Sequence, residues 1–141
     1  MPDPTASPRP PAPPPPPGAP GPLDVIELRG LRLVGICGAL PEERERAQPL
    51  EGDLDVHADL SPSGRSDVLG DTVDYGALCD AVAAHVAAGE PQLLEHLAEG
   101  LAAAVLDLDP HIDAVTVAVR KLRPPVPHQL ATSGVRITRR R

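Results

Sequence analysis

The sequence predicts an α+β fold in which a four-stranded antiparallel sheet carries two helices on one face. Four segments alternate between apolar and polar residues, as strands buried on one side do, and two adjacent segments between them have apolar residues at helical spacing. The predicted order is therefore ββααββ. Strands that follow one another without a helix between them favour antiparallel pairing, which gives an α+β sandwich.

The first two strand segments are joined by a short acidic turn. Residues 24–35 alternate through Ile26 and Leu28 and change phase at Gly30, which predicts a β-bulge at the glycine. Residues 50–60 show the clearest alternation, with polar residues between Leu50, Leu54, Val56, Ala58 and Leu60. One face of this second strand is therefore predicted to be buried and the other to face water.

Two helices are predicted in the middle of the chain. The first follows Asp74, whose side chain can cap it, and ends at Gly89. The second is predicted to have Pro91 in its first turn and to end at Asp107. Its buried face is predicted to consist of Leu94, Leu97, Leu101 and Val105.

The last two strand segments, residues 112–121 and 134–140, complete the sheet. A sheet of four strands has two open edges, which proteins cover, charge or pair. Little in this sequence blunts those edges. We therefore expect the chain to associate with itself into a ring, in which each edge pairs with a strand of a neighbouring copy.

Proline dominates the start of the chain. Residues 1–22 contain 12 of the 20 prolines and almost no residue that could pack in a core. We expect a disordered, proline-rich tail, inert rather than a ligand for an aromatic-lined groove, followed by a folded domain of residues 23–141. Because Asp3 and Arg9 cancel, that domain carries the whole net charge of −7, which argues against nucleic acid as a partner.

No segment has the pattern of a secretory signal or of a membrane span. We therefore expect a cytoplasmic protein without membrane contact, in which Cys37 and Cys79 are reduced. The histidines are isolated along the chain, with no HxH or HxxxH spacing, so no metal site is expected. They are His57, His85, His96, His111 and His128.

Four positions at the ends of predicted elements carry groups capable of chemistry. Glu43 lies in the turn GALPEERER, Tyr75 is the only aromatic residue of the chain, Glu95 falls in the first turn of the second helix, and Lys121 ends the third strand. Each also has an ordinary structural explanation, such as a solvated loop, a helix-dipole interaction or a charged strand end. None of the four identifies a function alone.

In combination and order, these segments resemble the dihydroneopterin aldolase family. GICGALPEERE is similar to the family's loop, DTVDYGAL to its tyrosine segment, LLEHLAE to its pterin-anchoring helix start, and KLRPPVP to its lysine followed by prolines. The resemblance covers residues 24–139 and includes the ββααββ order. It implies a tunnelling fold and a homo-octamer of two stacked tetrameric rings, with active sites shared between subunits.

The resemblance also implies an activity. Family members cleave 7,8-dihydroneopterin by a retro-aldol reaction to 6-hydroxymethyl-7,8-dihydropterin and glycolaldehyde in folate biosynthesis, and the same chemistry can epimerise the 2′ carbon. They use no cofactor, metal or Schiff base, because the pterin itself accepts the electrons. Two alternatives stay open, an epimerase acting on dihydroneopterin or its triphosphate and a non-catalytic pterin-binding protein that forms rings.

The resemblance implies a role for each matching residue. Lys121 is the general acid/base, and Glu43 lies near the dihydroxypropyl chain of the substrate, where it binds and handles protons. Tyr75 comes from the neighbouring subunit, binds the substrate and helps to move protons. The backbone amide of Leu94 and the carboxylate of Glu95 bind the amino-pyrimidinone edge of the pterin.

The sequence departs from the family pattern around the predicted pocket. Cys37 stands where many relatives have histidine, and Leu33 and Ile36 stand where aromatic residues are common. These changes leave the predicted catalytic positions filled. The resemblance therefore defines the reaction type more closely than the substrate preference.

Overall fold

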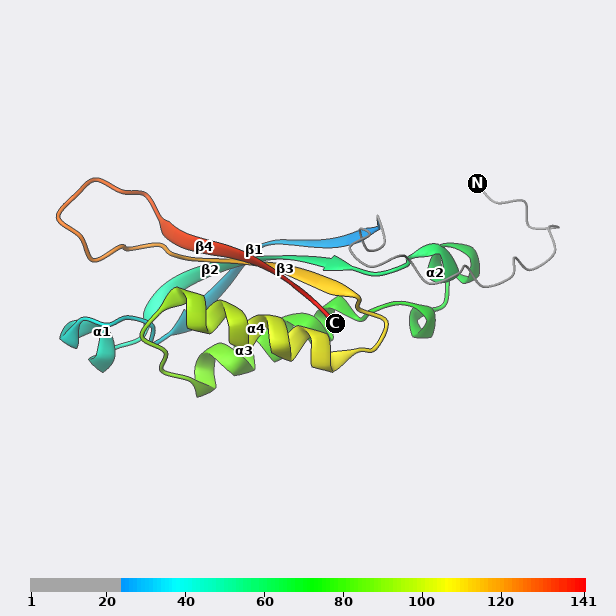
Figure 1. Cartoon of the computed structure of the whole chain (residues 1–141), viewed down its shortest axis with the longest axis horizontal. Coiled ribbons are helices and arrows are strands. Elements are labelled where there is room, and N and C mark those ends of the chain that lie inside the picture. Colours follow the sequence, from blue (N-terminus) through cyan, green and yellow to red (C-terminus); the bar gives the residue numbers. More distant parts are fainter. Residues whose placement is uncertain (1–23) are drawn as a thin grey trace.

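The computed structural model describes residues 24–141 as one sheet with helices on one side (Figure 1). The prediction of a disordered tail over residues 1–22 lies outside the described residues. In chain order, the elements are β1 (Val25–Gly35), α1 (Pro41–Glu45), β2 (Gln48–His57), α2 (Ser61–Ser66), η1 (Leu69–Asp71), α3 (Tyr75–Ala88), α4 (Leu94–Leu108), β3 (Ala114–Lys121) and β4 (Ser133–Arg140).

The predicted fold class is confirmed. The four strands lie in the order β1-β2-β3-β4, and every neighbouring pair is antiparallel. Helices α3 and α4 cover one face of the sheet, where α3 contacts β1 and α4 contacts β3 and β4 (Figure 1). Three short elements, α1, α2 and η1, were not predicted, because three to six residues are too few to display a helical period.

An aliphatic core fills the space between the sheet and the two long helices. The predicted buried face is confirmed for Leu50, Leu54 and Val56 of β2. The strand ends at His57, so Ala58, which is buried, and Leu60, which is half-buried, follow it rather than belong to it. The predicted apolar face of α4 is also buried, at Leu94, Leu97, Leu101 and Val105. The largest fully buried side chains are Leu50, Leu78, Leu101, Ile112, Val56, Val82, Val105, Val115, Val117, Val119 and Cys37.

The β-bulge predicted at Gly30 is present. The register of β1 on β2 shifts between Leu28 and Leu31, and Gly30 has a φ of +71°, which L side chains rarely adopt. The backbone N–H of Gly30 donates to Asp53 Oδ1 at 2.8 Å. The glycine therefore allows β1 to change phase while both halves of the strand keep an apolar side toward the core.

The ends of the long helices agree with the prediction in part. Asp74 caps α3, since its Oδ1 accepts hydrogen bonds from the N–H groups of Gly76 and Ala77, and Gly89 follows the last helical residue in an extended conformation. The prediction that Pro91 lies in the first turn of the second helix is wrong, because α4 begins at Leu94. The Pro91 carbonyl instead accepts a hydrogen bond from another loop.

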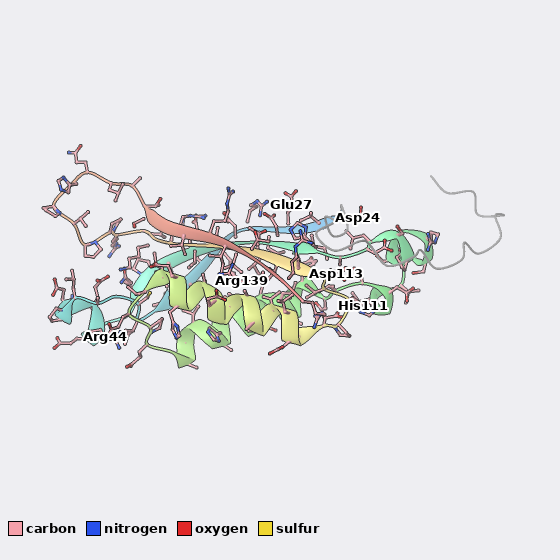
Figure 2. All side chains as sticks on the ribbon, viewed as in Figure 1. Asp24, Glu27, Arg44, His111, Asp113 and Arg139 are labelled. Carbon is pink, nitrogen blue, oxygen red and sulfur yellow. The ribbon has the colours of Figure 1, made fainter. Side chains whose placement is uncertain are left out.

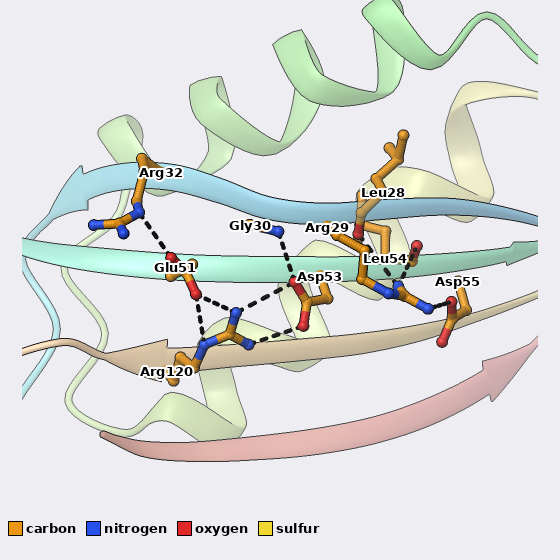
Figure 3. Close-up of polar contacts among 9 residues, drawn as sticks. All are labelled: Leu28, Arg29, Gly30, Arg32, Glu51, Asp53, Leu54, Asp55 and Arg120. Atoms are coloured by element: carbon orange, nitrogen blue, oxygen red, sulfur yellow. Dashed lines mark hydrogen bonds and ion pairs between the residues drawn. The ribbon is translucent and has the colours of Figure 1, made fainter. Parts of the chain in front are cut away.

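The sheet face opposite the helices carries a charged network (Figure 3). Arg120 lies between two carboxylates of β2, donating through Nε to Glu51 at 3.0 Å and through Nη1 to Asp53 at 2.9 Å. Arg32 also pairs with Glu51, and Arg29 with Asp55, both across β1 and β2. Alternation along the strands thus separates an aliphatic side from a charged side.

Within residues 24–141, none of the helices combines the length and the apolar content that crossing a bilayer requires.

Candidate active site

Two of the predicted site residues form a buried ion pair. Lys121 Nζ donates to Glu43 Oε2 at 2.6 Å, although the two residues are 78 positions apart in the sequence. Their side chains are only 13% and 8% exposed. Glu43 comes from α1 and Lys121 from the last position of β3, so the pair lies at one end of the sheet.

The local backbone explains how Glu43 reaches this position. Pro41 occupies the first turn of α1, where its missing N–H costs nothing, and the Glu43 N–H donates to the Leu40 carbonyl at 2.9 Å. Lys121 pairs with Leu50 in the β2–β3 register, and Leu50 follows α1 closely in the chain. The β2–β3 pairing therefore brings Lys121, at the end of β3, close to α1, which carries Glu43.

A glutamine holds the carboxylate from a second side. Gln48 Nε2 donates to Glu43 Oε2 at 3.0 Å and to the Cys37 carbonyl at 2.7 Å. Burial acts to raise the pKa of Glu43, but the hydrogen bonds from Lys121 and Gln48 outweigh burial and hold this pKa below its ordinary value. The carboxylate is therefore ionised at neutral pH despite being buried.

Arg44 ties α1 to the loop that precedes α4. Its Nη1 donates to the carbonyls of Gly38 and Pro91 at 3.2 and 3.1 Å, and the Gly38 N–H donates to the same Pro91 carbonyl at 3.1 Å. Arg44 lies at one end of the molecule, far from His111 and Asp113, which lie past its middle (Figure 2). These bonds bring the start of α4 to the end of the molecule where Glu43 lies.

Glu95 is exposed in the first turn of α4, as predicted. Burial raises the pKa of the Cys37 thiol, and the charges of Lys121, Glu43, Arg44 and Glu95 all act on this thiol. Glu95 is therefore within electrostatic reach of the same thiol as Glu43 and Lys121. Within residues 24–141, its carboxylate has no hydrogen-bond or ion-pair partner.

Tyr75 does not join the other three residues within one chain. It is the first residue of α3 and is 64% exposed. The other end of α3 lies beside the site, since Gly35 is in contact with Val86. At 1.5 Å per helical residue, Tyr75 lies roughly 16 Å along the helix from Val86. Its expected role in a neighbouring copy stays a prediction.

Comparison with known proteins identifies the family. A sequence model of the dihydroneopterin aldolase family matches residues 26–138. The chain belongs to the dihydroneopterin aldolase family. A dihydroneopterin aldolase of Streptococcus pyogenes serotype M3 is 35% identical over 119 residues, which cover 84% of this chain and all of the relative.

Solved dihydroneopterin aldolases have the same fold. The Escherichia coli enzyme in complex with neopterin has a TM-score of 0.76 and 25% identity, covering 83% of this chain and 99% of that one. The enzyme of Burkholderia thailendensis bound to guanine has a TM-score of 0.69 and 26% identity, covering 84% of this chain and 91% of that one. The resemblance inferred from motifs is thus confirmed in both sequence and structure.

Two features of the candidate site in this aldolase family member were not predicted from the sequence. Lys121 is the only lysine, since the other 12 basic residues besides histidine are all arginines. A single lysine in such a chain favours a role that arginine cannot fill, because an ammonium group can exchange a proton and a guanidinium cannot. Gln48 gave no such signal, because its contacts depend on how the turn folds back onto β2.

In the described part of the chain, the ion pair lies apart from any cluster of metal ligands and from the hollow between the helices. Among residues 24–141, no three His, Cys, Asp or Glu side chains are grouped as metal ligands. A separate surface hollow lies between α3 and α4 and includes His85, Glu90, His96 and Gly100, but none of the predicted catalytic residues. Neither feature adds a residue to the Glu43–Lys121 pair.

Proposed function

We propose that this chain cleaves 7,8-dihydroneopterin by a retro-aldol reaction, giving 6-hydroxymethyl-7,8-dihydropterin and glycolaldehyde in folate biosynthesis. The observation that carries the proposal is the buried 2.6 Å contact between Glu43 and Lys121 in a chain of the dihydroneopterin aldolase family. A carboxylate and an amine in one desolvated place can hold and pass protons, which each step of this reaction requires.

The substrate supplies the electron sink in this proposal. The C2′ hydroxyl loses its proton, the C1′–C2′ bond breaks, and its electrons enter the pterin ring as N5 takes up a proton. A proton then returns to C1′ while N5 gives one up, which leaves the hydroxymethyl product and glycolaldehyde. The proposed reaction therefore needs neither a cofactor nor a metal. Reclosing the bond on the other face would give 2′-epimerisation.

Glu95 and Leu94 bind the pterin in this account. The amino-pyrimidinone edge presents two parallel N–H donors, which one carboxylate can accept as a forked pair, and the Leu94 N–H adds a backbone contact. Neopterin in the Escherichia coli enzyme and guanine in the Burkholderia enzyme share this edge. Glu95 is exposed at the start of α4, so it is accessible to such a ligand.

Lys121 and Glu43 handle the protons. Lys121 acts as the general acid/base toward the pterin and the side chain, directly or through water, and Glu43 lies near the dihydroxypropyl chain. Because the two groups begin in contact, a proton that leaves one has an acceptor within hydrogen-bond distance. The fully buried Cys37 forms part of the wall behind them, where many relatives have histidine.

Tyr75 completes the site from a second copy of the chain. Apolar side chains are exposed near Tyr75, at Val68 and Leu69, and also near the ion pair, at Leu40 and Leu93. Strands β1 and β4 are the edges of the sheet in one chain, and association would pair them. These features support association of several copies, and the assembly that we propose is a homo-octamer of two stacked tetrameric rings with shared active sites.

The enzyme is proposed to act in the cytoplasm. Both cysteines are free thiols, Cys37 buried and Cys79 half-buried, which suits a reducing compartment.

Product analysis tests the proposed function. Purified protein is incubated separately with 7,8-dihydroneopterin and with its monapterin epimer, and the pterins and glycolaldehyde are quantified by chromatography. We expect release of 6-hydroxymethyl-7,8-dihydropterin and glycolaldehyde in equal amounts. Bound but unchanged pterin without glycolaldehyde would favour a non-catalytic binding protein, and interconversion of the epimers without cleavage would favour an epimerase. The triphosphate of dihydroneopterin, run in parallel, tests for a phosphorylated substrate.

A further inference from the structure

Among residues 24–141, Gln48 is the one neutral side chain that hydrogen-bonds to the Glu43–Lys121 pair. It begins β2 and pairs with Gly35 of β1, just before the chain turns into α1. Its amide nitrogen reaches the Cys37 carbonyl at 2.7 Å and Glu43 Oε2 at 3.0 Å. A primary amide nitrogen has two N–H donors, so both of them are used in these contacts.

The two contacts of Gln48 differ in rigidity. The acceptor on Cys37 is a backbone carbonyl of a fully buried residue, and it has no side-chain torsions of its own. Glu43 has a side chain with several rotatable bonds, which an amide held on this carbonyl can restrain. Gln48 therefore ties the carboxylate of α1 to the backbone of the turn that precedes α1.

The same carboxylate oxygen receives both neighbours. Lys121 Nζ donates to Glu43 Oε2 at 2.6 Å, and Gln48 donates to that oxygen from another direction. When Lys121 gives up its proton during a reaction, Glu43 loses its cation but keeps the donor from Gln48. A buried carboxylate without any donor would tend to take up a proton itself, because burial disfavours the charged form.

We propose that Gln48 is a positioning residue for the proposed aldolase reaction: it holds the Glu43 carboxylate in place so that Lys121 returns to the same geometry after each proton transfer. Gln48 acts through Glu43 and does not touch the substrate in this account. The inference rests on the proposed function for its effect on turnover. Its effect on the ion pair itself does not depend on turnover.

The charged groups around the pair come from several elements. Lys121 lies on β3, Arg44 on α1 and Glu95 at the start of α4, and the Cys37 thiol lies in the turn between β1 and α1. Substituting Gln48 leaves all of these groups in place. A change in the behaviour of Glu43 would therefore be due to the lost amide donors.

The test replaces Gln48 with a side chain of similar length that has no N–H donor. Gln48→Met should lower kcat about tenfold and change KM much less, because the carboxylate is displaced while the pterin-binding residues stay in place. In a Glu43→Gln background, the same substitution should change kcat by less than about twofold, since a residue acting through Glu43 has nothing left to position. Gln129→Met, at an exposed glutamine in the β3–β4 loop, is the matched control and should behave as wild type.

A readout without turnover separates this inference from the proposed function. Because Lys121 is the only lysine, ¹³C-lysine labelling gives one side-chain signal, which responds when Glu43 is protonated. In Gln48→Met, the acid transition of this signal should move to higher pH than in wild type. Gln48→Asn keeps the N–H donors but is too short to span both acceptors, so it should shift the acid transition in the same direction. This variant replaces Gln48→Met in the test if the methionine variant does not fold.

The possible results are distinct. Wild-type protein that does not cleave the substrate would overturn the proposed function, and the lysine signal would still decide the role of Gln48. An unchanged acid transition in both Gln48 variants would overturn the inference. An equal loss of kcat in the wild-type and Glu43→Gln backgrounds would also overturn the inference. Gln48 would then only join the start of β2 to the backbone of Cys37, without acting through Glu43.

Discussion

Gly38 lies against the carboxylate of Glu43, so closely that a Cβ atom on Gly38 would be 2.2 Å from Glu43 Cδ. The end of a flexible side chain could normally move aside. This carboxylate is buried and held by Lys121 and Gln48, so moving it breaks both contacts. The absence of a side chain at position 38 is therefore a condition for the ion pair.

Gly38→Ala should reduce turnover at least about tenfold, because the displaced carboxylate no longer meets Lys121. The forced fit should also lower the free energy of unfolding by about 1 to 3 kcal/mol. Gly64→Ala is the control, since a Cβ on Gly64 would meet no atom within 4 Å. Steady-state kinetics and urea unfolding of both variants check the prediction. Normal turnover in a folded Gly38→Ala protein would show that the site tolerates the displacement.

Glu95→Ala should damage ligand binding much more than folding. Loss of a charge-assisted fork should weaken binding of a pterin by about 1.5 to 3 kcal/mol, while loss of a carboxylate at a helix start costs only about 0.3 to 1 kcal/mol of stability. Asp107→Ala removes an exposed carboxylate from the other end of α4 and is the control. Calorimetric titration with neopterin measures the affinity. Unchanged affinity in folded Glu95→Ala would remove Glu95 from the site.

The stability contributed by Glu43 should depend on pH. Burial acts to raise the pKa of Glu43, but the hydrogen bonds from Lys121 and Gln48 set it below the value near 4.3 of an unfolded chain. A depressed pKa contributes stability that is present above the unfolded pKa and is lost as pH falls through the folded pKa. The free energy of unfolding of wild type should therefore fall more steeply than that of Glu43→Gln as pH drops below about 5. Parallel curves from urea unfolding at several pH values would contradict this.

Arg120→Lys should destabilise the charged side of the sheet. One ammonium cannot reproduce the fork with which Arg120 contacts both Glu51 and Asp53, so we expect a loss of about 1 to 3 kcal/mol in the free energy of unfolding. Arg123→Lys, at an exposed position just after β3, is the control and should change stability little. Thermal unfolding of the two variants side by side measures the difference. Equal stability would mean that solvent screens the network completely.

Periodicity predicted the parts of the fold that repeat a pattern. The alternation of apolar and polar residues predicted β2. The β-bulge at Gly30 and the helix cap at Asp74 each require a particular residue type at one position, so they too could be predicted from the sequence. The start of α4 could not, because Pro91 is held outside the helix by the N–H of Gly38, a contact between distant segments. A single sequence gives no measure of such contacts.

The candidate site was predictable only through resemblance. Spacing gave no reason to pair Glu43 with Lys121, since 78 residues separate them and the β2–β3 register brings them together. The contacts of Gln48 could not be predicted for the same reason, because they form only when the chain folds. Tyr75 differs, because within residues 24–141 of one chain no contact brings it to the pair, and its proposed role depends on the proposed assembly of several copies.

Subunit complementation tests the central claim of a site shared between chains. Tyr75→Phe and Lys121→Ala should each be weakly active, with Lys121→Ala reduced by roughly 10²- to 10⁴-fold, as is typical when a positioned acid/base group is lost. After the two variants are mixed and reassembled, native mass spectrometry of differently tagged chains confirms mixed oligomers. About one pocket in four should then combine an intact tyrosine with an intact lysine from different chains, and activity should rise above that of either variant. Confirmed mixed oligomers without any recovered activity would contradict the shared site, and a fully active Lys121→Ala protein would contradict the catalytic role of the lysine as well.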